Sequence, residues 1–181
     1  MIKSEFFKIL QENFPIIIFC LCIGILSGYF LNSSSSEGFG ILLIAPAIMT
    51  TTGNIGSIFG SQLTTALHSG VIGAKFQKSR VLFTKILGMV ILSFLMSILI
   101  GFCAYFISLI IKIQGKELIH FLLLTTISGL ITSSLMILIS IFVSYATFSR
   151  GLDPDNFVTP LVSTLSDFIS VLIIIIVDII I

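Results

Sequence analysis

The 181-residue sequence is 56% hydrophobic and only 9% charged, with a mean hydropathy of +1.22, whereas soluble domains carry roughly 25% charged residues. These values exclude an ordinary soluble domain and predict an integral membrane protein. A net charge of +1 argues against a nucleic-acid-binding protein, which normally needs a basic surface. No polar stretch is long enough for a soluble module, so we expect a single membrane domain over residues 1–181 without a regulatory module.

Five apolar runs follow one another along the chain, and each is long enough to cross a bilayer as a helix. They predict an all-α, polytopic fold with spans at about 14–31, 39–70, 81–111, 118–148 and 157–181. The first run has the position of a signal peptide, but Ile25-Leu26-Ser27 makes a poor cleavage site. Cys20, Gly24 and Gly28 repeat every four residues like a helix-packing edge, so we expect this span to remain in the membrane.

The second span is rich in hydroxyls and glycines although it lies in an apolar chain. At 100° per residue, its polar side chains share one stripe and its small residues share a neighbouring stripe. The polar stripe predicts an edge that meets water or ions, and the small stripe predicts close approach of another backbone. The span is long enough to cross with a tilt or with a break near Gly53. The polar stripe contains Thr50, Asn54, Ser57, Ser61, Thr64 and His68, and the small stripe contains Met49, Gly53, Gly56 and Gly60.

Small and hydroxyl-bearing residues also follow one face of the third span and one face of the fourth. Such faces are typical of helix packing in membranes, and we expect packing here rather than chemistry. They consist of Ser93, Ser97, Gly101, Ala104 and Ser108 in the third span, and of Thr125, Gly129, Thr132, Ser133, Ser140 and Ser144 in the fourth.

Asp167 is an acidic side chain deep within the fifth apolar run. An ionisable group at such depth is costly and normally faces a cavity or a partner. Thr159, Ser163, Ser166 and Ser170 recur around it at helical spacing, and would surround the carboxylate with oxygen ligands. No basic residue lies at matching depth, so a mobile cation is the expected counter-charge. The alternative is a buried Asp that bonds neighbouring hydroxyls purely for helix association.

The chemistry of these oxygen atoms favours a hard cation. Mg²⁺ prefers carboxylate, hydroxyl and carbonyl oxygens, and it sheds water reluctantly, so a polar pore is expected to hold it hydrated. Cys20, Cys22 and Cys103 lie in apolar runs without the spacing of a zinc site, and we expect them to be buried small residues.

The segment Asp153-Pro154-Asp155-Asn156 precedes the fifth span. It fits a helix start, because Asp and Asn cap free amides and acidic side chains favour the positive helix end. It also fits a cation site at the cytoplasmic mouth. The residues predicted to contact the cation are therefore Asp167, Asn54, Thr50, Ser57, Ser163, Ser166, Asp153, Asp155 and Asn156.

The basic residues predict the orientation in the membrane. Seven of the nine Lys and Arg residues fall on one side of a five-span layout and two on the other, which places the N-terminus in the cytoplasm and the C-terminus outside the cell membrane. Five helices supply two polar edges, too few to enclose a hydrated ion without exposing polar groups to lipid. A homodimer around a twofold axis doubles these edges, with the second and fifth helices facing inward around a central pore.

Two motifs resemble the membrane domain of the MgtE and solute carrier family 41 magnesium transporters. The first is Pro46 followed by a hydroxyl-rich run into Gly53-Asn54-Ile55-Gly56, then Gln62 and Thr64; the second is Asp153-Pro154-Asp155-Asn156 with the run from Pro160 to Asp167. The resemblance implies a five-helix bundle that pairs as a homodimer, or is duplicated in one chain, with a pore lined by the second and fifth helices. It also implies that the fifth-helix carboxylate, here Asp167, helps bind hydrated Mg²⁺. The sequence lacks the cytoplasmic sensing domains of the bacterial pattern, including the paired CBS module, so gating by those domains is not expected of this chain.

The primary interpretation is a divalent-cation channel or carrier that prefers Mg²⁺, with two chains forming one pore. One alternative is a proton-coupled carrier of a small solute that uses Asp167 as its proton site, and another is a non-transporting membrane assembly subunit. The sequence leaves channel and carrier open, as well as Co²⁺, Ni²⁺, Mn²⁺ and Zn²⁺ as substrates. It contains no nucleophile elbow, phosphate loop or metalloprotease helix, so we expect neither an enzyme nor a resident cofactor, with Mg²⁺ as the transported ion.

Overall fold

The computed structural model describes residues 2–34, 39–73, 79–111 and 117–181, and these ranges contain five α-helices. Each helix includes a segment that is long and apolar enough to cross a membrane, which confirms the predicted all-α fold. The polar residues 2–13 continue the helix of the first span rather than preceding it. The helices are α1 (Ile2–Ser34), α2 (Phe39–His68), α3 (Arg80–Ile110), α4 (Leu118–Ser149) and α5 (Pro154–Ile180).

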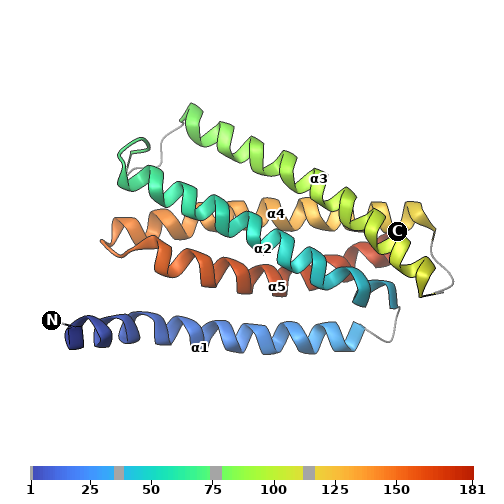
Figure 1. The fold of residues 1–181 in the computed structure, drawn as a ribbon, viewed down its shortest axis with the longest axis horizontal. Coiled ribbons are helices and arrows are strands. Elements are labelled where there is room, and N and C mark those ends of the chain that lie inside the picture. Colours follow the sequence, from blue (N-terminus) through green and yellow to red (C-terminus); the bar gives the residue numbers. More distant parts are fainter. Residues whose placement is uncertain (1, 35–38, 74–78, 112–116) are drawn as a thin grey trace.

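The helices run alternately in opposite directions, and α2, α4 and α5 form the packed centre of the bundle (Figure 1). α3 packs on α4 and α2, whereas α1 packs chiefly along α5. The two termini lie at opposite ends of the bundle, as five crossings require (Figure 1). One half of the core is built around Ile48 and Leu124, and the other half around Phe59 and Ile137.

The glycine stripe of α2 is the surface on which α5 and α4 pack. A Cβ atom added at Gly53 would lie 3.4 Å from Cβ of Ser166 on α5. At Gly56, the added atom would lie 2.5 Å from Cγ1 of Val162 on α5 and 2.8 Å from Cβ of Met136 on α4, closer than real side chains approach. The predicted close packing is therefore confirmed, and α2 passes Gly53 as one continuous helix without a break.

The small faces of α3 and α4 serve helix packing, as predicted, and the structure shows that they pack against each other. Ser93 donates to the carbonyl oxygen of Gly129 at 3.4 Å and also bonds the hydroxyl of Ser133. On another side of α4, Ser140 donates to the carbonyl oxygen of Gly56 at 2.7 Å. These buried hydroxyls connect α3 to α4 and α4 to α2.

The prediction that the cysteines are buried is wrong for two of the three. Cys22 and Cys103 are exposed on the outer surface, while Cys20 is half-buried and its thiol donates to the carbonyl oxygen of Pro160 at 3.4 Å. A helix that faces lipid is apolar on every side, so an apolar run alone does not separate its buried positions from its exposed ones.

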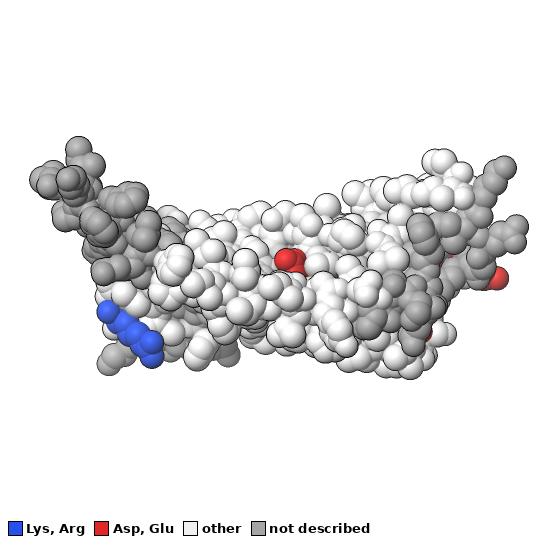
Figure 2. Space-filling model, turned by 90° about the horizontal axis from the view of Figure 1, so that it is seen from below, with Lys and Arg blue, Asp and Glu red and all other residues white. Residues whose placement is uncertain are grey.

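The described Lys and Arg side chains, Arg80, Lys85 and Arg150, lie at the end of the bundle where α2 leads to α3 and α4 leads to α5. Figure 2 shows one face of the molecule with basic atoms at one end, acidic atoms at the other end, and one acidic group midway between them among uncharged residues. By the positive-inside rule, the basic end is the one predicted to face the cytoplasm.

Candidate functional site

The polar stripes of α2 and α5 lie side by side. The hydroxyl oxygens of Ser57 on α2 and Ser163 on α5 are 3.2 Å apart, and both residues are half-buried. Ser163 also bonds the carbonyl oxygen of Thr159, at 2.9 Å, one turn earlier in α5. Two stripes that are far apart in the sequence thus form one surface.

Asp167 lies at the midpoint of α5, one turn beyond Ser163, and Asn54 lies about one turn before Ser57 on α2. Because α2 and α5 run in opposite directions (Figure 1), both steps lead the same way along the bundle. At a rise of 1.5 Å per residue, the step from Ser57 to Asn54 is about 4.5 Å and the step from Ser163 to Asp167 is about 6 Å. Asn54 and Asp167 therefore lie at nearly the same depth. Thr50 follows one turn further along α2.

The side chains of this surface remain accessible. Thr50, Asn54 and Thr159 are exposed, while Ser57, Ser163 and Asp167 are half-buried. We call these six residues the α2–α5 polar face. It brings together five of the nine residues that the sequence predicted for cation contact, and all five lie in the two helices expected to line a pore.

Asp167 makes no hydrogen bond or ion pair with any residue that the structure describes. The alternative role, helix association through bonds to neighbouring hydroxyls, predicts such bonds. Ser163 and Ser166 instead direct their hydroxyls to other partners within the bundle. This arrangement favours a role for the Asp167 carboxylate outside the helix contacts of the chain.

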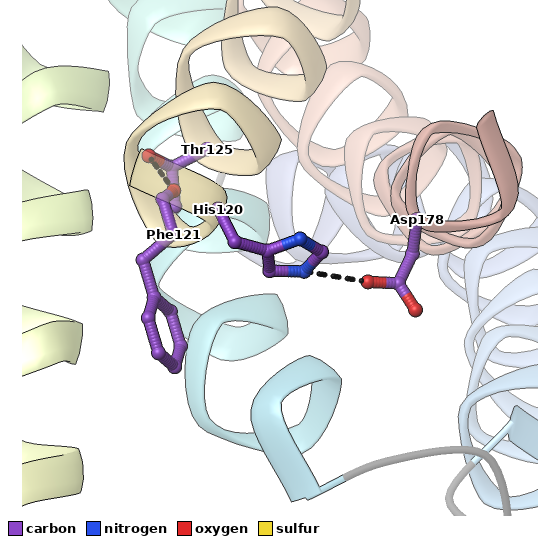
Figure 3. A network of polar contacts seen from close by, with 4 residues as sticks. All are labelled: His120, Phe121, Thr125 and Asp178. Atoms are coloured by element: carbon purple, nitrogen blue, oxygen red, sulfur yellow. Dashed lines mark hydrogen bonds and ion pairs between the residues drawn. The ribbon is translucent and has the colours of Figure 1, made fainter. Parts of the chain in front are cut away.

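A second acidic side chain of α5, Asp178, has a different environment. Its Oδ1 lies 3.1 Å from Nε2 of His120 on α4, and the two side chains are only 14% and 21% exposed (Figure 3). The pair lies at the end of the bundle opposite the basic residues. A carboxylate near a helix end is ordinarily solvated, but here a histidine from another helix approaches it, which spacing within α5 does not reveal.

Behind the polar face, a buried hydroxyl cluster holds α2 against α5. Oγ1 of Thr52 lies 2.7 Å from Oγ of Ser166 and 3.1 Å from Oγ of Ser170, and all three residues are buried. Thr52 also bonds the carbonyl oxygen of Ile48 at 2.8 Å, within its own helix. Ser166, predicted as a cation contact, thus lies behind the face and supports its geometry.

Thr52 was absent from the sequence predictions, although a signal for it exists. It lies four residues after Ile48 and three before Ile55, which places it on the apolar stripe of α2. A hydroxyl on the buried stripe of a membrane helix needs a partner from a neighbouring helix or from its own backbone, and Thr52 has both kinds.

The remaining residues of the α2 stripe, toward the basic end, differ in exposure. Ser61 is exposed, but Thr64 is fully buried. His68 is exposed, and its ring lies 5.3 Å from that of Phe148 in an edge-to-face arrangement. Burial of Thr64 therefore interrupts the polar stripe of α2, and the accessible part that includes Asn54 and Ser57 ends at Ser61.

The acidic segment Asp153-Pro154-Asp155-Asn156 lies at the start of α5, at the basic end of the bundle and apart from the polar face. Asp153 is exposed and immediately precedes the helix, Pro154 is the first helical residue, and the amide of Asn156 donates to the carbonyl oxygen of Asp153 at 3.3 Å. Proline at the first position is typical of helix starts. Asn156 is half-buried, and the side chain of Asp155 lies outside the described part of the chain. Asp153 is separated from Asp167 by about 21 Å along the helix axis.

The polar face offers a carboxylate together with neutral oxygen atoms. Among the described residues, no three His, Cys, Asp or Glu side chains gather into a metal-binding group. One carboxylate with hydroxyl and amide oxygens suits an ion that keeps its own water shell, as Mg²⁺ does, better than an ion bound directly by many protein ligands.

Comparison with known proteins agrees with this chemistry. The family model MgtE, described as a divalent cation transporter, matches residues 45–177. Solute carrier family 41 member 2 of Xenopus laevis is 27% identical over 136 residues, which cover 72% of this chain and 24% of that protein. The Mus musculus protein of the same name is also 27% identical over 136 residues, covering 72% of this chain and 23% of that protein. The chain thus spans about a quarter of the length of these relatives, and no solved structure matches it.

The family match begins in α2 and ends in α5, so it includes the whole polar face and the glycine stripe. It supports a membrane transporter rather than an enzyme, as the sequence predicted. This multi-pass, five-helix chain belongs to the MgtE family of divalent cation transporters.

Proposed function

We propose that two copies of this chain form a pore for hydrated Mg²⁺, lined by the α2–α5 polar face of each copy. The position of Asp167 carries this proposal, because it is a half-buried carboxylate at the midpoint of a membrane helix. An ionised carboxylate at that depth is costly without a counter-charge. No described residue pairs with it, and a cation in transit supplies the missing charge.

The neutral residues of the face would then act on the water shell of the ion. Thr50 and Asn54 are exposed near the depth of Asp167, and their oxygens can accept hydrogen bonds from waters bound to Mg²⁺. Because Mg²⁺ dehydrates reluctantly, these side chains would contact its bound waters rather than the ion itself. Such indirect contacts would hold the ion in the pore weakly enough for it to leave. Asp153, Asp155 and Asn156 would attract cations at the cytoplasmic mouth of the pore. They lie at the start of α5, half the length of the helix away from Asp167.

The exposed polar face also supports a dimer. In a single chain, Thr50, Asn54 and Thr159 would meet lipid, where polar groups without partners are costly. A twofold axis places the same face of a second copy opposite the first. The two faces then enclose a polar path with two Asp167 carboxylates at its centre.

A cysteine introduced at Thr50 should crosslink to its counterpart in the second copy, because Thr50 is exposed on the proposed pore side. Ile91→Cys provides the control, since Ile91 is 52% exposed on α3, which is not one of the two helices proposed to line the pore. Both variants are made in a chain without Cys20, Cys22 and Cys103 and treated with a short crosslinker in native membranes. Equal crosslinking at both positions, or crosslinking only at Ile91→Cys, would contradict the proposed dimer.

Flux measurements in liposomes test the proposed function directly. Purified protein should conduct Mg²⁺ down its concentration gradient, detected by an Mg²⁺-sensitive dye in the lumen, with or without a proton gradient. A panel of Co²⁺, Ni²⁺, Mn²⁺ and Zn²⁺ establishes the selectivity. Uptake of a solute that follows pH and ignores Mg²⁺ would favour the proton-coupled carrier, and the absence of any flux would favour an assembly subunit.

A further inference from the structure

A second polar region lies away from the α2–α5 polar face, where the last turns of α2 meet the first turns of α3. A cavity of about 280 Å³ opens there, at the basic end of the bundle. Its polar lining comes from Gln62, Thr65, Ser69 and Lys85, and its apolar lining includes Val71 and Val81. The volume is near the lower limit of small-molecule sites, roughly 300 Å³, so it suits a lipid headgroup rather than a whole lipid.

Lys85 supplies a positive charge at this cavity. Its Nζ donates to the carbonyl oxygen of Gln62 at 3.1 Å, which holds the ammonium beside α2. A lysine ammonium has three donors, and no described carboxylate pairs with it. The charge and two donors therefore remain available to an anion in the cavity.

The neighbouring polar groups can also contact an anion. The side-chain amide of Gln62 is exposed and makes no hydrogen bond with the described residues, so its N–H groups can donate. Thr65 and Ser69 are exposed as well, and their hydroxyls donate to backbone oxygens of α2 at 3.0 and 3.3 Å. These hydroxyls can turn toward a stronger acceptor, such as a phosphate oxygen.

An apolar track leads from the cavity along α3 toward the membrane centre. Val81, Lys85, Gly88, Leu92 and Leu95 follow one another at helical spacing and share one side of α3. Leu92 and Leu95 are 41% and 57% exposed, and a Cβ atom added at Gly88 would have no neighbour within 4 Å. A cation beside a shallow cavity, continued by an open apolar track, matches a charged headgroup with an acyl chain.

We propose that this cavity binds the phosphate headgroup of an anionic phospholipid, with Lys85 as its counter-charge and the track on α3 in contact with an acyl chain. The location supports this ligand, because the basic end is predicted to face the cytoplasmic leaflet, which is rich in anionic lipids. The site is independent of the proposed pore, since its residues lie outside the α2–α5 polar face.

Native mass spectrometry of the purified protein with added phosphatidylglycerol or phosphatidylcholine tests the proposal. The protein should bind phosphatidylglycerol more tightly, and Lys85→Gln should weaken this binding about five-fold, the effect of one basic residue near a lipid surface. Arg150→Gln is the matched control, because Arg150 is exposed at the same end but outside the cavity. It should leave the affinity unchanged.

A second variant separates the cavity from the charge. Val81→Phe fills the mouth of the cavity without altering any charge, and it should also weaken binding of phosphatidylglycerol, whereas Lys85→Arg should retain it. Circular dichroism and thermal unfolding establish that each variant is folded. Equal losses in Lys85→Gln and Arg150→Gln, no effect of Val81→Phe, or equal affinity for the two lipids would overturn the proposal. Displacement of the lipid by inorganic phosphate at the same concentration would show a site for free phosphate and would overturn the lipid assignment.

Discussion

Replacing Asp167 with Asn should lower Mg²⁺ flux through the reconstituted protein by about thirty- to 150-fold. The substitution keeps the shape of the side chain and removes one charge per chain. A dication and a carboxylate about 5 Å apart, with a water between them, attract each other by of order 6 kcal/mol at an effective dielectric constant near 20. Desolvation cancels much of this energy, and a remainder of about 2 to 3 kcal/mol corresponds to the stated loss of occupancy. Liposome flux and Mg²⁺ binding measure it.

Other single substitutions in the same protein serve as controls for the flux measured with Asp167→Asn. Asp167→Glu should retain part of the flux, because it keeps the charge. Asp178→Asn removes another carboxylate of α5, but one at the helix end that is paired with His120, so it should lower flux far less. Thr50→Ala, Asn54→Ala and Ser163→Ala each remove one neutral group and should also have smaller effects. If Asp167→Asn leaves both flux and Mg²⁺ binding unchanged in assembled protein, the carboxylate serves helix association.

Replacing Gly56 with Ala should lower the free energy of unfolding by about 1 to 3 kcal/mol, the usual cost of overpacking a tight interface. The added methyl group would lie 2.5 Å from Val162 and 2.8 Å from Met136, so α2 must move away from both α4 and α5. That movement also strains the bond from Ser140 to the carbonyl oxygen of Gly56, now 2.7 Å long. Denaturant or thermal unfolding in detergent, followed by circular dichroism, measures the change.

Gly88→Ala is the control for this prediction, because it makes the same chemical change on a lipid-facing side of α3. No atom lies within 4 Å of a Cβ added at Gly88, and Ala favours helix over Gly by about 1 kcal/mol. This variant should be as stable as the original protein or slightly more stable. A similar loss of stability in both variants would mean that α2 does not pack through its glycines as the structure describes.

The number and approximate limits of the helices could be predicted because hydrocarbon length imposes them. The small faces of α3 and α4 could be predicted for a related reason: serine and glycine at helical spacing in an apolar helix have few uses other than contact with another helix. The residues Ser93 and Gly129, which meet in the structure, illustrate this. Asp167 could be singled out because a charge in such surroundings is expensive.

The periodicity of a single helix does not predict which of its side chains meet those of a neighbouring helix. Ser163 and Ser166 are three residues apart and equally polar, yet Ser163 lies at the rim of the polar face and Ser166 is buried against Thr52. Which of them is buried depends on the rotation of α5 against α2, and that rotation is set by close packing at Gly53. The pairing of Asp178 with His120 depends in the same way on the register of α5 against α4.

The loose attachment of α1 has a consequence for the order in which this protein is assembled. α1 packs chiefly on α5, a helix that the ribosome completes on the order of 10 s after α1 at ordinary rates of synthesis. Until then α1 must remain in the bilayer without the helix on which it packs. Its span has a mean hydropathy of 2.4 against 1.5 for α2, so lipid alone suffices to hold it. α2 emerges next with its hydroxyls and amide, and it packs chiefly on α4 and α5, which are made later. During this interval α1 is held by lipid, whereas the polar groups of α2 still lack the helices that will cover them.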